Sequence, residues 1–207
     1  MADPTLLLIR HAETPNTQAK RITGALDVPL SEAGRHHFES TVLPVARRYP
    51  LALIVSSPLA RARETAGILW TASDSYPPYT RGAVDVDLRP WNEGPAVQGR
   101  LLTAELKHYL SELEQYRDLT PQGGESFRVF GARTLGCLRR LLKQAGAVRD
   151  QGAVAVVTHS RNIEVALAWH KAGMRGVYFG PVDHGGDPPG GLHEWRYRGG
   201  HWLVRMV

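Results

Sequence analysis

Three short aliphatic runs constrain the fold of this chain more than any other feature. They span Thr5 to Ile9, Leu51 to Val55 and Ala153 to Thr158, and each leads into a polar loop and then a stretch with helical patterning. This order is typical of β-α-β units, whose parallel strands read as continuously hydrophobic because helices cover both faces of the sheet. The sequence therefore predicts an α/β fold, a three-layer αβα sandwich with a mostly parallel central sheet.

Helical patterning fills the intervals between and after these runs. The stretch from Ser31 to Tyr49 begins with a good N-cap residue, and Pro44 inside it should kink or split the helix. Further helices are predicted over Ala60 to Trp70, Leu101 to Tyr116 and Ser126 to Ala145, with another starting near Asn162.

Two segments depart from the β-α-β pattern. Thr71 to Gly99 is rich in loop-forming residues, and the alternation of Val84, Val86 and Leu88 predicts a short strand within an excursion over the sheet. Near the C-terminus, alternating apolar residues on both sides of Gly199-Gly200 predict a β-hairpin.

Length and composition limit the organisation of the chain. At 207 residues, with 43% of them apolar, we expect a single domain over residues 1–207. The aliphatic runs are far shorter than the roughly 20 residues that span a bilayer, so we expect no membrane segment. The single cysteine, Cys137, cannot form an internal disulfide, which favours a reducing compartment and a cytoplasmic location.

The formal net charge of +5 favours anionic partners. The basic residues are scattered as single residues and pairs, without a long basic block and without the interleaved aromatic residues that stack on bases. We therefore expect small anionic ligands as partners and no nucleic acid.

Polar side chains follow each aliphatic run. Arg10 and His11 end the first run, Ser56 to Arg61 follows the second, and Thr158-His159-Ser160 ends the third. Because ligands collect beyond the carboxyl ends of strands in open α/β sheets, two imidazoles and two guanidiniums should converge there. Arginine binds oxyanions through forked hydrogen bonds, and a neutral histidine nitrogen is a competent nucleophile toward phosphorus. The sequence predicts a phosphate pocket.

Five segments of the chain resemble the signatures of the histidine phosphatase (phosphoglycerate mutase-like) superfamily. Arg10-His11-Ala12-Glu13-Thr14 is similar to its R-H-G-E-T motif, Gly24-x-x-Asp27-x-Pro29-Leu30-Ser31-x-x-Gly34 to G-x-x-D-x-P-L-[ST]-x-x-G, Ser56-Ser57-Pro58-Leu59-Ala60-Arg61 to S-S-P-L-x-R, and Gly124-Glu125-Ser126 with Val156-Val157-Thr158-His159 to its G-E-S and second-histidine segments. The matches occur in order and in register over most of the chain.

The resemblance implies a two-step phosphoryl transfer. His11 would attack phosphorus and become phosphohistidine, while Arg10, Arg61 and His159 would surround the phosphate oxygens and stabilise the transition state. The attacking nitrogen must be neutral, so a backbone carbonyl should hold the other N–H of this ring. Either Asn16 or Thr17 would be a further phosphate ligand, and Ser160 is another candidate. The resemblance implies no metal and no cofactor.

One departure from the family pattern concerns the acid that protonates the leaving group. The family places a glutamate in an L-x-E segment, whereas Leu88-Arg89-Pro90 has proline at that position, and proline has no proton to give. Glu93 is the nearest replacement, since a carboxyl partly desolvated beside Trp91 would have a raised pKa. The alternative is a solvated loop glutamate. Glu125 and Asp87 are weaker candidates. If no acid replaces the missing one, substrates with good leaving groups would be favoured over alkyl phosphates.

The resulting expectation is a phosphatase that hydrolyses a small phosphorylated metabolite through a phosphohistidine on His11. Two alternatives stay open: a phosphoglycerate mutase-type phosphoryl transfer, and a catalytically impaired module that binds a phosphorylated ligand. The sequence leaves the identity of the substrate and the oligomeric state open.

Overall fold

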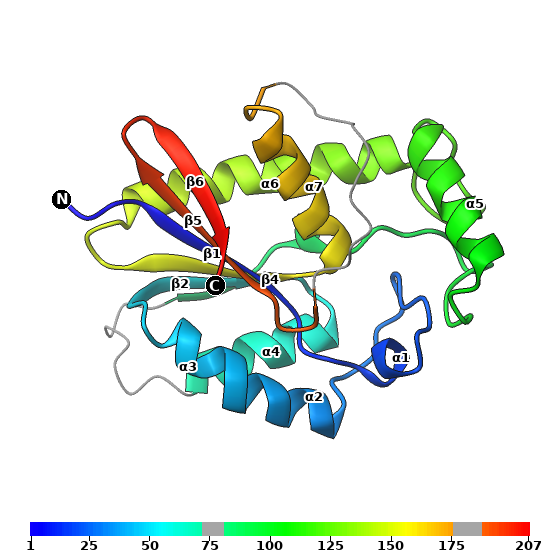
Figure 1. Ribbon diagram of the computed structural model, residues 1–207, viewed down its shortest axis with the longest axis horizontal. Helices are drawn as coiled ribbons and strands as arrows, with labels where there is room; N and C mark the ends of the chain where they lie inside the picture. The colour runs from blue at the N-terminus through cyan, green and yellow to red at the C-terminus, as the bar shows by residue number, and fades with distance from the viewer. Residues whose placement is uncertain (72–80, 176–187) are drawn as a thin grey trace.

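The fold centres on a sheet with the strand order β3-β2-β4-β1-β5-β6 (Figure 1). The computed structural model describes residues 1–71, 81–175 and 188–207. Its strands are β1 (Thr5–Arg10), β2 (Leu51–Ser56), β3 (Arg81–Val84), β4 (Ala153–Thr158), β5 (Leu192–Arg198) and β6 (His201–Met206). The first four pair in parallel, and the C-terminal hairpin of β5 and β6 adds to β1 antiparallel. The mostly parallel sheet and the hairpin were both predicted from the sequence.

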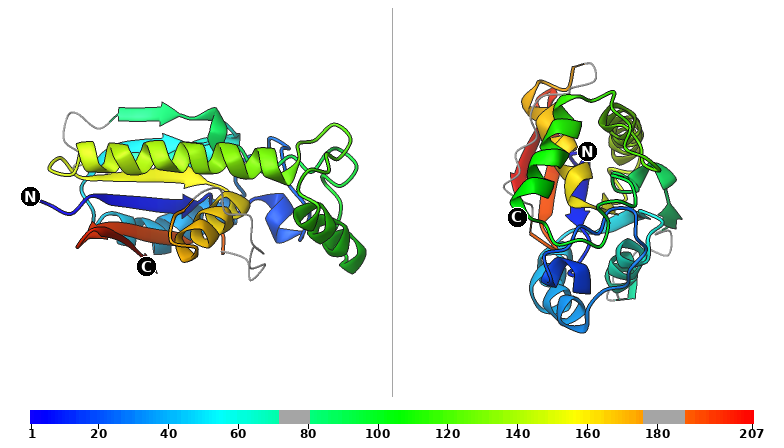
Figure 2. Two further views of the ribbon diagram at one scale, coloured as in Figure 1. Left: turned by 90° about the horizontal axis from the view of Figure 1, so that it is seen from above. Right: turned by 90° about the vertical axis from the view of Figure 1, so that its right-hand side faces the viewer.

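Helices cover both faces of this sheet (Figures 1 and 2). They are α1 (Pro15–Gln18), α2 (Glu32–His37), the π-helical turn η1 (Phe38–Val42), α3 (Leu43–Ala46), α4 (Ala60–Thr71), the 3-10 turn η2 (Val86–Leu88), α5 (Ala104–Gln115), α6 (Phe127–Ala147) and α7 (Ser160–Lys171). In Figure 1, α6 and α7 lie on one side of the sheet and α2, α3 and α4 on the other. The three-layer architecture is therefore confirmed. None of the helices in the described ranges is long and apolar enough to cross a bilayer.

Successive side chains of β1 belong to two separate hydrophobic cores. Leu6 and Leu8 join the core that contains residues of α6 and α7, whereas Leu7 and Ile9 join the core that contains residues of α3 and α4. This division follows from the two-residue period of a strand, which points neighbouring side chains to opposite faces. Burial on both faces explains why the strand sequence is continuously apolar.

The helical stretch around Pro44 is continuous, but it changes to a π-helical turn just before the proline. Ser31 caps α2 by accepting a hydrogen bond from the Gly34 N–H at 3.0 Å, and the π-helical turn η1 precedes α3, which contains the proline. Proline lacks the N–H that a regular helix needs at this position. The predicted end at Tyr49 was wrong, because α3 ends at Ala46; Pro50 follows Tyr49 and disfavours helical backbone there.

The predicted strand through Val84, Val86 and Leu88 was wrong. β3 ends at Val84, and Val86–Leu88 form η2, because the Asp85 carboxylate accepts a hydrogen bond from the Asp87 N–H at 2.9 Å and closes a turn. The segment does not pass over the sheet at this point, since β3 pairs with β2 as an edge strand. The part of the predicted excursion at residues 72–80 lies outside the described residues.

Two helix starts also differ from prediction. Helix α5 begins at Ala104 after the Thr103 cap, because Leu101 is instead paired with Arg21 in an isolated β-bridge. Helix α7 begins at Ser160, directly after His159 in the N-cap position.

The carboxyl ends of three parallel strands meet at one edge of the sheet. The His11 N–H donates to the Thr158 carbonyl at 2.9 Å, and the Ser57 N–H donates to the Val157 carbonyl at 2.9 Å. These bonds continue the β1–β4 and β2–β4 ladders one residue beyond the strands. They fix the backbone of the polar residues that follow each strand.

A close packing of α2 on the loop after His11 depends on Gly34. The Ser31 N–H donates to the Glu13 carbonyl at 2.9 Å, which brings the start of α2 against this loop. A Cβ atom added to the buried Gly34 would collide with the same carbonyl oxygen. Steric space therefore requires glycine at position 34.

We predict that Gly34→Ala lowers the free energy of unfolding by about 1–3 kcal/mol, because the backbone of the loop must move to admit the methyl group. Gly67→Ala in α4 is the control, since nothing lies within 4 Å of a Cβ there. It should be neutral or stabilise by up to about 1 kcal/mol through helix propensity. Urea unfolding of both variants measures this, and equal effects would contradict the packing argument.

Candidate active site

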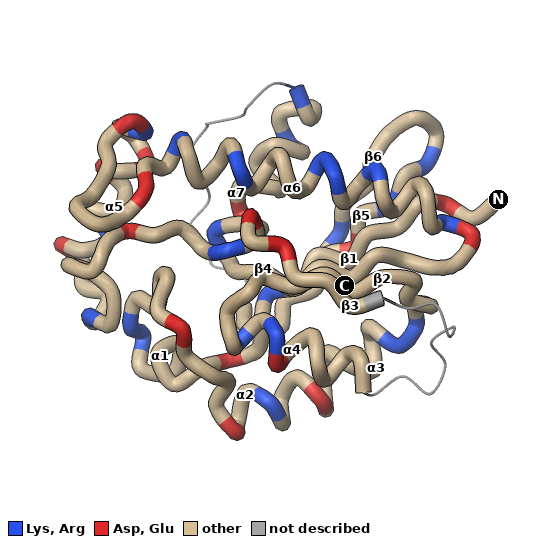
Figure 3. Tube along the Cα trace, turned by 180° about the vertical axis from the view of Figure 1, so that it is seen from behind, with Lys and Arg blue, Asp and Glu red and all other residues tan. Residues whose placement is uncertain are grey.

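A cavity of about 750 Å³ opens at the carboxyl edge of the parallel strands. Its lining includes the basic residues Arg10, Lys20, Arg21, Arg61, Lys107 and Arg161, the histidines His11, His108 and His159, and the carboxylates Glu93 and Glu164. Elsewhere along the chain, basic and acidic residues are interspersed (Figure 3). The excess of cationic side chains around this cavity suits an anionic ligand.

His11 lies at the end of β1 and is 5% exposed. Its Nδ1 is 2.7 Å from the Ala12 carbonyl oxygen, which can only accept, so Nδ1 carries the proton and Nε2 keeps its lone pair. Burial, followed by the nearby guanidinium of Arg61, holds the pKa of His11 well below its usual value. The ring is therefore neutral, with an unprotonated Nε2, as the phosphoryl-transfer hypothesis requires.

Arg61 contacts His11 directly and is 1% exposed. Its Nε–H donates to His11 Nε2 at 3.2 Å, while its Nη1 and Nη2 donate to the carbonyls of Leu26 and Gly24 at 2.6 and 2.8 Å. Burial lowers the pKa of this guanidinium to about 10, so it still carries its charge at neutral pH. The loop around Gly24 thus holds Arg61 in place beside His11.

His159 faces His11 across the site. The ring centroids lie 5.1 Å apart with an interplanar angle of 62°, and both rings line the cavity. His159 Nε2 is 2.8 Å from Ser57 Oγ. Burial, then the charge of Arg61, lowers the pKa of His159 well below its usual value. The structure therefore brings together the two imidazoles and the guanidinium of Arg61, with Arg10 on the same cavity wall.

The three remaining phosphate-binding candidates do not all reach the cavity. Thr17 and Ser160 line it, and Thr17 Oγ1 lies 2.9 Å from Thr14 Oγ1. Asn16 is not among the described residues of the lining; its carbonyl accepts a hydrogen bond from the Arg21 N–H at 2.8 Å. Of the two alternatives left open by the sequence, the geometry favours Thr17.

Glu93 is a buried lining residue and not a solvated loop glutamate, since it is only 8% exposed. Its Oε2 packs against Gly24, where a Cβ atom would collide with it, and has no hydrogen-bond partner among the described residues. Burial raises the pKa of this carboxyl to about 7, against the opposing charges of Arg161 and Arg61. A carboxyl that holds a proton near neutral pH thus lies in the cavity.

The weaker acid candidates are occupied elsewhere. Glu125 forms an ion pair with Arg133, and Asp87 forms one with Arg140 at 2.8 Å. Neither carboxylate is among the described residues that line the cavity. Pro90 does line it, directly before the segment that leads to Glu93.

Two residues of the site had no role assigned from the sequence. Ser57 was quoted only as part of a motif, although its position directly after β2 would place it at the strand edge. Arg161 was not singled out; it lines the cavity and forms ion pairs with Glu114 and Glu164 at 2.8 and 2.7 Å. Its place in the first turn of α7, two residues after His159, could have identified it from the sequence as a site residue.

Within the described ranges, no group of three or more His, Cys, Asp or Glu side chains is placed to hold a metal ion.

Comparison with known proteins finds relatives that include a phosphatase. The glucosyl-3-phosphoglycerate phosphatase of Mycolicibacterium vanbaalenii is 31% identical over 168 residues, which cover 79% of this chain and 72% of that protein. A protein of Mycobacterium tuberculosis named as bifunctional is 34% identical over 167 residues, 78% of this chain, but the match spans only 43% of that protein.

Solved structures and a family model extend the likeness to almost the whole chain. The mycobacterial glucosyl-3-phosphoglycerate phosphatase in complex with VO3 superposes with a TM-score of 0.70 at 26% identity, over 98% of this chain and 96% of that one. The model of the histidine phosphatase superfamily (branch 1) matches residues 6–207. The chain therefore belongs to the histidine phosphatase superfamily, branch 1.

Proposed function

We propose that this protein is a metal-independent phosphatase that hydrolyses a small phosphorylated metabolite through a phosphohistidine on His11. The observation that carries the proposal is the state of the His11 ring. Its Nδ1–H is held by the Ala12 carbonyl, and its unprotonated Nε2 lies in the cavity beside Arg61 and opposite His159. The glucosyl-3-phosphoglycerate phosphatases among its relatives support a substrate of this general class.

In the first step, His11 Nε2 attacks the substrate phosphorus, so an N–P bond forms while the P–O bond to the leaving group breaks. In the structure, Arg61 Nε–H donates to His11 Nε2. When the substrate is bound, this N–H and the guanidinium of Arg10 donate hydrogen bonds to the phosphate oxygens. His159, Ser57 and Thr17 supply further hydrogen bonds. Preorganised donors of this kind stabilise charge on the transferring phosphoryl group without reorganisation.

Glu93 gives its proton to the leaving-group oxygen in the same step. In the second step the Glu93 carboxylate takes a proton from water, the water oxygen bonds to phosphorus, and the N–P bond breaks to release phosphate and neutral His11. The raised pKa of Glu93, about 7, suits both directions of proton transfer. The proline at position 90 is then compatible with catalysis, because a different residue supplies the acid.

We infer a cytoplasmic location from the single cysteine of the chain, since Cys137 cannot form an internal disulfide and suits a reducing compartment. Fractionation of cells that express the protein measures this. Recovery mainly from an exported fraction would contradict it.

We predict that His11→Ala abolishes phosphate release from nitrophenyl phosphate, with a loss of at least about 10⁴-fold in kcat/KM because the nucleophile is gone. His36→Ala, on the exposed side of α2, is the matched histidine control and should retain activity. The same assay with 3-phosphoglycerate and its bisphosphate tests the mutase alternative. If isomer exchange exceeds hydrolysis, the proposed phosphatase is instead a mutase. Phosphate binding without turnover would support a binding module.

We predict that Glu93→Gln lowers kcat/KM for an alkyl phosphate by about 10²–10⁴-fold and for nitrophenyl phosphate only slightly. Alkoxide leaving groups need a proton, whereas nitrophenolate departs as the anion. Steady-state kinetics with both substrates give the ratio. Equal slowing of the two substrates would exclude Glu93 as the acid.

We predict that kcat/KM for the alkyl phosphate falls as the pH rises through about 7. Glu93 is in its proton-donating form below its pKa of about 7 and loses that proton above it, whereas His11 is already neutral there because its pKa is lowered. The alkaline fall should be absent with nitrophenyl phosphate and in Glu93→Gln. An unchanged alkaline limb in that variant would assign the fall to another group.

A further inference from the structure

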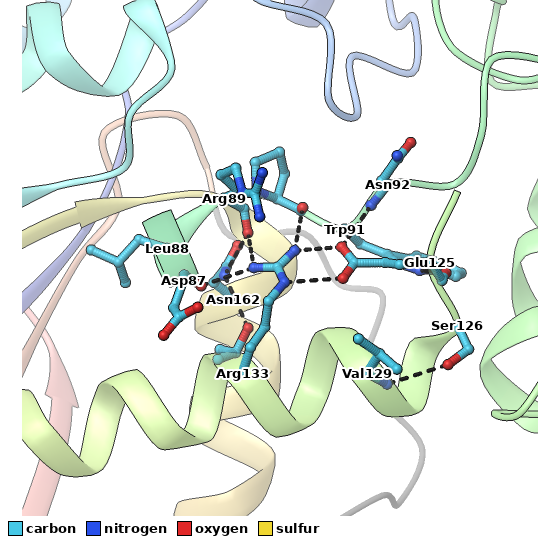
Figure 4. Close-up of polar contacts among 12 residues, drawn as sticks. Asp87, Leu88, Arg89, Trp91, Asn92, Glu125, Ser126, Val129, Arg133 and Asn162 are labelled. Atoms are coloured by element: carbon cyan, nitrogen blue, oxygen red, sulfur yellow. Dashed lines mark hydrogen bonds and ion pairs between the residues drawn. The ribbon is translucent and has the colours of Figure 1, made fainter. Parts of the chain in front are cut away.

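Arg133 on α6 holds the backbone of the loop that leads to Glu93 (Figure 4). Its Nη1 donates to the carbonyls of Asp87 and Arg89 at 2.8 and 2.7 Å, and its Nη2 donates to the Pro90 carbonyl at 2.8 Å. All three carbonyls lie within six residues of the proposed acid in the chain. The loop is thus fixed from the side of α6.

Glu125, two residues before α6, completes this arrangement. Its carboxylate accepts from Arg133 Nε at 3.0 Å and from Arg133 Nη2, and also from the Asn92 N–H at 3.3 Å. Its backbone N–H donates to the Asn92 carbonyl at 2.9 Å, and its carbonyl accepts from Trp91 Nε1 at 2.9 Å. Glu125 therefore continues the contacts of Arg133 up to the residue directly before Glu93.

The guanidinium of Arg133 has its full set of donors engaged. Nε, Nη1 and Nη2 together offer five N–H donors, and they meet three carbonyls and both carboxylate oxygens of Glu125. The side chain is 13% exposed and that of Glu125 is 20% exposed. A lysine has only three donors around one point and cannot reproduce this fork.

The Glu93 carboxyl has a hydrogen bond with its own backbone, but its second oxygen is not held by another residue that the structure describes. Its Oε2 is buried and has no hydrogen-bond partner among the described residues. The direction in which this carboxyl points is therefore set by the loop backbone and by packing against Gly24. Whatever holds residues 87 to 92 also determines where the acid lies relative to His11.

We propose that Arg133 and Glu125 are positioning residues that hold the 87–92 segment so that the Glu93 carboxyl faces the leaving-group oxygen of a substrate bound at His11. This inference rests on the proposed function. It explains how the loop can function with proline at the position where the family has its acid. Arg133 holds the carbonyl of Pro90, and the proposed acid follows three residues later. Small displacements of a proton donor have large effects on rate.

A second route from Arg133 to catalysis must be separated from this one. The positive charge of Arg133 is among the causes that lower the pKa of His159. A loss through His159 would slow every substrate, because this residue contacts the phosphoryl group and not the leaving group. A loss through Glu93 would slow only substrates whose leaving group needs a proton.

Arg140 offers a matched control on the same helix. It forms ion pairs with the side chains of Asp85 and Asp87 at 3.0 and 2.8 Å, and it is 54% exposed. It therefore contacts the same segment near its beginning but does not bind the carbonyls near Glu93. Arg140→Met removes an arginine and its ion pairs but keeps the hydrogen bonds of Arg133 and Glu125 to the 87–92 segment.

The test measures kcat/KM for an alkyl phosphate and for nitrophenyl phosphate in the full chain. Arg133→Met should lose about 10²-fold with the alkyl phosphate and less than about threefold with nitrophenyl phosphate. Arg133→Lys should show the same selectivity with a smaller loss, and it serves if Arg133→Met does not fold. Arg140→Met should leave both values within about twofold. Equal slowing of both substrates in the folded Arg133 variant would overturn the inference.

A double-mutant cycle with Glu93→Gln gives the decisive comparison. If Arg133 acts through Glu93, adding Arg133→Lys to Glu93→Gln causes no further loss with the alkyl phosphate. Full additivity of the two losses would overturn the inference and leave the proposed function intact. Failure of the proposed function has a different signature, because His11→Ala would then retain phosphatase activity.

Discussion

The hydrogen bond between His11 Nδ1 and the Ala12 carbonyl is the interaction on which the site depends. A carbonyl can only accept, so it fixes the tautomer and leaves Nε2 unprotonated, with its lone pair accepting from Arg61 Nε–H at the cavity wall. The bond is local, formed within two residues of the end of β1. The ladder bond from the His11 N–H to Thr158 holds that backbone on the sheet. The sheet therefore sets the chemical state of the ring as well as its position.

Burial acts on the two proton-bearing groups of the site in opposite senses, and both senses are useful. It lowers the pKa of His11, so that the ring is neutral, and raises that of Glu93 to about 7, so that the carboxyl carries a proton near neutrality. Arg61 is also buried but stays charged, because its pKa falls only to about 10. One cavity thus brings together a neutral imidazole, a carboxyl that holds a proton near neutrality and a fixed cation.

The sequence predicted those features whose burial produces a pattern in consecutive residues. The buried strands and the residues after them predicted the sheet edge at which His11, Arg61 and His159 meet. The sequence left open whether Glu93 is buried or solvated, and the structure places it buried in the cavity lining. The turn at Asp85 was missed because one side-chain bond overrode the alternation around it. Arg133 was missed because it binds backbone carbonyls more than 40 residues away. Every residue has such a carbonyl, so the sequence pattern does not indicate which ones an arginine will bind.

The protonation state of His11 is the central claim, and histidine ¹⁵N NMR tests it most directly. In protein with ¹⁵N-labelled histidine, the His11 signals are assigned by their absence in His11→Ala. We predict a neutral ring with the proton on Nδ1 and an unprotonated Nε2, unchanged from neutral pH down to well below the usual histidine pKa of about 6.5. A proton on Nε2, or a doubly protonated ring at neutral pH, would contradict it.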